Sequence, residues 1–282
     1  MDGIKEIKSI ELASFTTTLT AVSVIFSAII AIILGIAVAA LVPSGGSVAI
    51  YLIPTIIVGT FMYGIYNIFC EGLLYNLLSK KMKTIAIQIK DNEISKISTT
   101  ETAIMFSIIV TIQAILVYLV SVLVLPLFLS TVMQTLMFSG QQTIAYSIYQ
   151  VLVLISQPAT VALTIFGTFI ITFVFTLIGC YIYNFLASSG RGVIVNLSKE
   201  DKFTSIDSID SLRLALAGGV VYGVLSLISA IINIVSGADI MGAVTSFFAG
   251  LIIGFVGGLL FAVFYNFISK KVGKIKLELI DF

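Results

Sequence analysis

Long apolar stretches alternate with short polar connections along this chain. Charged residues are almost absent from 12–79, 102–190 and 214–269, where the only exceptions are Glu71 and Asp239. A transmembrane helix needs roughly 20 apolar residues, so each stretch can hold one helix out and one helix back. The pattern predicts six transmembrane helices, over 13–41, 50–78, 102–128, 158–187, 213–235 and 242–269.

The second helix of each predicted pair ends in Tyr-Asn, and a period-two pattern follows each time. After Tyr75, for example, Ile85, Ile87 and Ile89 alternate with other residues, which predicts a half-buried strand. Short segments with apolar residues at every third position follow the first two of these strands, and the N-terminus carries a similar segment. The pairs are Tyr75-Asn76, Tyr183-Asn184 and Tyr265-Asn266.

This recurrence predicts three tandem repeats, 1–90, 91–198 and 199–282, each with two transmembrane helices and a strand. Two spans return each repeat to its starting side, so the repeats are expected to be parallel around a pseudo-threefold axis. The second repeat has an extra outer segment, 130–157, whose pattern predicts an interfacial amphipathic helix. This helix either lengthens a connection or covers the outer mouth of the bundle.

The predicted fold class is therefore an all-α integral membrane bundle of six transmembrane helices in three parallel two-helix repeats, with a small cytoplasmic β cap. The cap is expected to be closed by pairing of the N-terminal and C-terminal strands, since a lone hairpin is only marginally stable.

Charge placement predicts the orientation in the membrane. The chain has 282 residues, is 59% hydrophobic and has a mean hydropathy of +1.17. All 15 Lys and Arg lie in the N-terminus, the 79–101 and 187–213 connections or the C-terminal tail. The positive-inside rule makes that side cytoplasmic, so we expect a multi-pass protein of the cell membrane with cytoplasmic N- and C-termini. A net charge of +1 gives no reason to expect nucleic-acid binding.

Small residues recur at every fourth position of the second helices, counted back from each Asn. Gly250, Gly254 and Gly258 form such a stripe in the third repeat. Small residues at this spacing let helix backbones approach closely, and Thr hydroxyls can bond across the contact. The stripes predict inter-repeat packing or, alternatively, a polar path lined by hydroxyl groups. In the second repeat the stripe consists of Thr160, Thr164, Thr168, Thr172 and Thr176.

Three further polar features lie in or beside the spans. Asn76, Asn184 and Asn266 can each bond a helix end or a neighbouring repeat. Glu71 is the only acid inside a predicted span; it either extends to the cytoplasmic interface or is a buried functional carboxylate. Asp239 is expected to cap the helix that follows it.

The residue types give no support for catalysis. The chain has no His and only 2 Cys, which excludes a Cys/His zinc site and a Ser-His pair. We expect no enzyme, no catalytic, cofactor-binding or metal residues, and no cofactor. Partners are expected to be membrane lipid and either another protein or a second copy of the chain. The leading interpretation is a non-enzymatic membrane module that binds or organises a partner. The alternative is a pore or carrier for ions or small polar solutes along the pseudo-threefold axis.

The second copy carries a resemblance to a known family. Its tail runs from Tyr183-Asn184 through a short polar stretch to Gly192-Val193 and an alternating strand that ends at Leu197. The segment that runs into the next predicted helix, 206–211, contains Ser and Asp residues. This arrangement resembles an uncharacterised bacterial transmembrane domain of unknown function, DUF family 3566. The resemblance covers about one repeat at a time. It implies the fold of the unit and no activity.

The family carries paired glycines between the polar stretch and the strand, and the copies depart from it there. In the second copy Arg191 replaces one of the two glycines. The third copy keeps only Gly273, and the first copy has neither.

The parallel arrangement predicts that reporters fused after Ile89 and after Leu197 both lie in the cytosol. The measurement is reporter activity and protease accessibility in intact cells. Reporters on opposite sides of the membrane would refute the arrangement.

Overall fold

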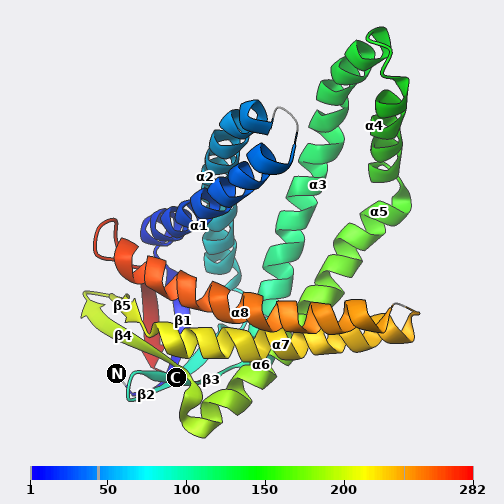
Figure 1. Ribbon diagram of the computed structural model, residues 1–282. Helices are drawn as coiled ribbons and strands as arrows, with labels where there is room; N and C mark the ends of the chain where they lie inside the picture. Colours follow the sequence, from blue (N-terminus) through cyan, green and yellow to red (C-terminus); the bar gives the residue numbers. More distant parts are fainter. Residues whose placement is uncertain (1, 43–44, 238, 282) are drawn as a thin grey trace. The chain divides into compact units, whose positions relative to one another are not determined.

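The computed structural model describes residues 2–42, 45–237 and 239–281. It divides into two compact units (Figure 1). Unit 1 comprises 1–102 and 177–282, and unit 2 comprises 103–176. Both boundaries fall inside long helices, at 102/103 and at 176/177.

Six helices in the described part of the chain are long and apolar enough to cross a membrane. Their length and composition are those of a multi-pass membrane protein. The fourth runs from Pro158 to Arg191, with non-helical backbone at Gly190 (φ 69°). It is composed of α5 (Pro158–Ala162), η1 (Leu163–Gly167), α6 (Thr168–Leu186) and η2 (Ala187–Arg191). The other five are α1 (Leu12–Leu41), α2 (Gly45–Leu78), α3 (Thr99–Phe138), α7 (Ser211–Val235) and α8 (Ile240–Ile268).

Acidic side chains cap three of these helices. Glu11 accepts a hydrogen bond from the backbone N–H of Ser14 (2.6 Å) at the start of α1, and Asp210 accepts one from Arg213 at the start of α7 (2.8 Å). Asp239 accepts from Gly242 (2.9 Å), which confirms its predicted role at α8. Each cap satisfies a backbone donor that the helix itself leaves free.

The strands of unit 1 form a closed six-stranded antiparallel barrel in chain order. The first and last strands pair, as predicted from the sequence. The segments with apolar residues at every third position are strands as well, so the cap is a barrel with no free edge. The strands are β1 (Gly3–Ile10), β2 (Ala86–Lys90), β3 (Glu93–Ile97), β4 (Val193–Glu200), β5 (Phe203–Ile209) and β6 (Lys276–Asp281).

A β-bulge interrupts β1, β3 and β5 at corresponding places. The pairing register shifts between Ile7 and Ser9 in β1, and it passes over Ser95 in β3 and Asp207 in β5. One extra residue in a strand turns the following side chains to the opposite face. Apolar residues three positions apart therefore return to the same face, which explains the period of three.

Both hairpin turns have backbone of positive φ. Asp91 and Asn92, between β2 and β3, have φ of 50° and 62°, as a tight hairpin turn requires. Between β4 and β5 the positive φ falls at Asp201 (53°), directly after β4 ends at Glu200.

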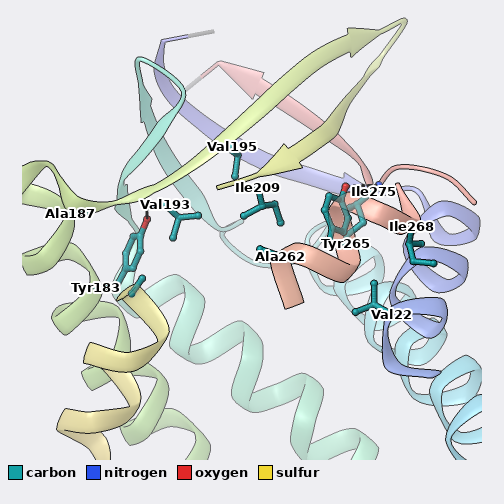
Figure 2. Packing of buried hydrophobic residues seen from close by; sticks show 11 residues of the cluster. Val22, Tyr183, Ala187, Val193, Val195, Ile209, Ala262, Tyr265, Ile268 and Ile275 are labelled. Carbon is teal, nitrogen blue, oxygen red and sulfur yellow. Dashed lines mark hydrogen bonds between the residues drawn. The ribbon is translucent and has the colours of Figure 1, made fainter. Parts of the chain in front are cut away.

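The core of unit 1 lies where the barrel meets the helix ends (Figure 2). Tyr265 is fully buried, and Tyr183 lies beside Val193. Other members of this cluster are Val22, Ala187, Val195, Ile209, Ala217, Ala262, Ile268 and Ile275. Burial of their apolar surface stabilises the junction of barrel and helices, at about 25 cal/mol per Å².

Unit 2 contains most of α3, α4 (Gln142–Ile155) and the first half of the fourth long helix. The sequence predicted that the third span ends at 128, but α3 continues through Pro126 to Phe138. Part of the predicted 130–157 segment thus extends α3, and α4 forms the rest. The Tyr118 hydroxyl on α3 donates to the carbonyl of Ile155 (2.9 Å) and ties the end of α4 to α3.

Candidate functional site

The Tyr residues at the ends of α2, α6 and α8 bind the barrel. We call β1, β3 and β5 the leading strands, because each directly precedes the first helix of a helical pair, and β2, β4 and β6 the trailing strands. Each Tyr is buried, and its hydroxyl donates a hydrogen bond to a leading-strand carbonyl. These bonds run from Tyr75 to Ile7 (2.5 Å), from Tyr183 to Ile94 (2.7 Å) and from Tyr265 to Ile206 (2.5 Å).

The same hydroxyls contact the trailing strands. The Tyr183 hydroxyl accepts a hydrogen bond from the N–H of Val193 (3.1 Å), and Tyr265 accepts from Ile275 (3.3 Å). Tyr75 bonds the backbone of Ile85 in the corresponding place. Each hydroxyl therefore joins a leading strand, a trailing segment and a helix end.

The Asn residues bind the last residue of the leading strands. In each case the side-chain oxygen accepts from the backbone N–H, and the side-chain nitrogen donates to the carbonyl of the same residue. The two-bond contacts join Asn76 to Ile10 (2.7 and 2.8 Å), Asn184 to Ile97 (2.8 and 2.8 Å) and Asn266 to Ile209 (2.8 and 2.8 Å). We call each Tyr-Asn pair with these bonds a clamp.

Sequence reasoning identified the pairs but missed their partners. It expected each Asn to bond a helix end or a neighbouring repeat, whereas each Asn bonds the leading strand of its own predicted repeat. The sequence did contain a pattern that could have indicated these partners. The carbonyls bound by Tyr and by Asn lie three residues apart in every case. They belong to the apolar positions of the period-three segments, such as Ile7 and Ile10.

The glycine stripe of α8 lies against α7. A Cβ on Gly254 would lie 2.4 Å from the Gly218 carbonyl oxygen, and one on Gly258 would lie 2.7 Å from the Leu214 carbonyl oxygen. A Cβ on Gly250 would lie 1.8 Å from the Ser226 hydroxyl. The stripe thus permits close packing with the preceding helix of the same predicted repeat, whereas the sequence suggested a neighbour from another repeat.

The five threonines of the second stripe lie on the fourth long helix of the chain, in the part that belongs to unit 2, and all five are half-buried. The Thr160 hydroxyl donates to the carbonyl of Leu154 (2.6 Å), and the Thr164 hydroxyl donates to the carbonyl of Thr160 (2.8 Å). These two hydroxyls are thus bonded to nearby backbone, a common arrangement for Thr in transmembrane helices. Thr168, Thr172 and Thr176 continue the stripe along α6.

Glu71 lies one turn before Tyr75 on α2 and is half-buried. Among the described residues, its carboxylate has no salt-bridge partner within 4.0 Å.

Ion pairs gather on the outer surface of the barrel at β5, β6 and β1. Lys274 contacts Asp207 (2.7 Å), and its hydrogen bond lowers the pKa of the Asp207 carboxyl below its ordinary value. Lys276 contacts Glu200 (2.7 Å) and lowers the pKa of that carboxyl in the same way. These groups are exposed, so each pair contributes little on its own. Two further pairs, Lys8–Glu278 (3.1 Å) and Lys5–Asp281, join β1 to β6.

Within the described residues, no group of three or more His, Cys, Asp or Glu side chains could hold a metal ion. No family model, curated protein or solved structure matches the chain. The resemblance to DUF family 3566 therefore stays a prediction.

Replacing Asn266 with Leu should destabilise the protein by roughly 2–4 kcal/mol, because it leaves the N–H and C=O of buried Ile209 without partners. Equilibrium unfolding in mild detergent measures the change. The control is Asn196→Leu, since the Asn196 side chain is exposed and, among the described residues, bonds the Ser208 hydroxyl rather than buried backbone. Equal losses in both variants would contradict a structural role for the clamp.

Replacing Gly254 with Ala should cost about 1–3 kcal/mol, because the new methyl group meets the backbone of α7, which moves only at a cost. Gly257→Ala is a matched control on the same helix, since a Cβ there has no neighbour within 4 Å. Thermal unfolding compares the two. A Gly254→Ala protein as stable as the control would disprove the close contact.

Proposed function

We propose that the protein is a non-enzymatic module of the cell membrane that binds or organises a partner through its barrel. In this proposal both termini and the barrel are cytoplasmic, and three parallel two-helix repeats surround a pseudo-threefold axis. The relation of each copy to DUF family 3566 belongs to the same proposal. The partner is a protein, either a different one or a second copy of the chain, and the helices contact membrane lipid.

The observation that carries the proposal is the set of three clamps. Each fixes two strands to a helix end through buried hydrogen bonds, so the barrel is held rigidly at the ends of the helices. A rigid, charged barrel held against the membrane is suited to present side chains to another macromolecule. Binding surfaces placed on regular elements keep their geometry better than surfaces on loops.

Buried aliphatic side chains of the barrel argue against a pore that runs through it. Ile89, Val195, Ile209 and Ile275 are buried aliphatic side chains in or beside the strands. A path along the axis would have to cross them, and aliphatic constrictions exclude water and ions. The hydroxyls of Thr160 and Thr164 are bonded to backbone, which leaves them less available to line such a path.

Two measurements test this proposal. Liposomes that contain the purified chain should pass ions and small polar solutes no faster than protein-free liposomes. In native membranes, a photoreactive residue at Lys90 or at Lys199, both exposed on barrel strands, should give one and the same adduct.

The matched control places the photoreactive residue at Ile36, which is exposed on the apolar surface of α1. It should not give the adduct, and the adduct should weaken in the Asn184→Leu protein because the barrel loses a clamp. An adduct of twice the chain mass identifies a second copy as the partner. Solute flux that disappears in Thr168→Val, or the absence of a shared adduct, would overturn the proposal.

A further inference from the structure

A cavity of about 580 Å³ lies beside the barrel, next to the end of α2. Its walls come from β1, β2 and β3, from the connection between α2 and β2, and from the start of α3, all within unit 1. This volume is within the range of small-molecule sites, roughly 300–1,000 Å³. The connection supplies Ser79, Met82 and Lys83, and the residues just before and at the start of α3 supply Ser98 and Glu101.

Charges of both signs line the cavity and do not pair with one another. Lys83 and Lys96 supply two positive charges, and Glu6 and Glu101 supply two negative charges. Among the described residues none of the four has a salt-bridge partner, and Glu6 accepts one hydrogen bond from the Thr84 hydroxyl (2.7 Å).

Elsewhere on the barrel, Lys5, Lys8, Lys274 and Lys276 each contact a carboxylate. Around the cavity, two lysines and two glutamates gather on one hollow without a salt bridge among the described residues. Such a mixed set of charges suits a ligand that itself carries both charges.

The cavity also borders the ends of two helices that are long and apolar enough to cross a membrane. Ser79 directly follows Leu78, the last residue of α2, and Glu101 lies in the first turn of α3. The headgroup layer extends roughly 5–8 Å beyond the hydrocarbon on each side of a bilayer. Residues that flank a membrane-spanning helix are the ones that can reach this layer.

We propose that this cavity binds the headgroup of a zwitterionic phospholipid with a primary ammonium group, that is, a phosphoethanolamine headgroup. Lys83 and Lys96 contact the phosphate, and Glu6 and Glu101 contact the ammonium. A primary ammonium has three N–H donors for carboxylates, whereas a choline group has none. Met82 and the other apolar lining residues contact the glycerol region. This site does not depend on the proposed partner function.

The test uses the full chain in phosphatidylcholine nanodiscs that contain small, equal amounts of phosphatidylethanolamine and phosphatidylglycerol. Native mass spectrometry then measures which lipids stay bound after the disc is removed. Phosphatidylethanolamine should be retained about tenfold better than either other lipid, the effect of one charge-assisted hydrogen bond.

Matched variants separate the two halves of the site. Glu101→Gln should lower retention of phosphatidylethanolamine to that of phosphatidylcholine. Lys83→Met should weaken retention of both of these lipids, because both carry the phosphate. Lys199→Met, an exposed lysine of β4 outside the cavity, should change neither. Circular dichroism checks that each variant is folded, and the Glu101 side chain has no hydrogen bond or ion pair with any residue that the structure describes.

Three results would overturn the proposal. Equal retention of all three lipids would mean that the cavity does not distinguish one headgroup from another. Preference for phosphatidylglycerol would mean that the lysines act as a simple basic patch. Displacement of the lipid by soluble phosphoethanolamine at equal concentration would identify a soluble ligand instead. Failure of the lipid assay leaves the crosslinking result for the partner unaffected, so the two proposals are separable.

Discussion

Buried backbone groups at the junction of helices and barrel must be hydrogen-bonded, and the clamps meet this requirement. Ile209 is 9% exposed, and both of its backbone groups bond Asn266. Without such partners each buried group would cost about 1–3 kcal/mol. The residue after Ile209 is the helix cap Asp210, so the bond to Asn266 also fixes where α7 begins. Two neighbouring side chains on α8 therefore set the position of the barrel strand and of the first helix together.

The strands show how much of the fold the sequence predicts. Alternating apolar residues indicated β2, β4 and β6, and the long apolar stretches indicated the six helices, with ends close to those observed except at the end of α3. The period of three in β1, β3 and β5 was ambiguous, because neither a regular strand nor a regular helix has that period. A single bulge resolves it: the extra residue at Ser95, for example, places Ile94 and Ile97 on one face. Bulges follow from pairing with another strand, which a local pattern does not contain.

The candidate residues were predicted more completely than their contacts. Small residues every fourth position indicated a close helix contact, but the partner of Gly254 is Gly218 on α7, a position that no spacing within α8 can specify. Likewise, the amide of an Asn can bond many groups, and the choice of Ile10, Ile97 and Ile209 depends on how the chain returns to the barrel. The charges around the cavity are unpaired because of that same tertiary arrangement, so charge composition alone could not indicate them.

The pairing of β1 with β6 differs from the other bulged pairs in one respect. β2 with β3, and β4 with β5, are joined by short turns, whereas β1 and β6 lie at opposite ends of the chain. Bringing distant ends together costs more entropy than closing a short turn. This pair carries contacts that offset the cost: Lys5 with Asp281, and Lys8 and Ser9 with Glu278. The two ion pairs along this seam are thus explained by closure of the barrel. The four charges around the cavity form no ion pair among the described residues although they gather on one hollow, which is the physical ground for assigning them to a ligand.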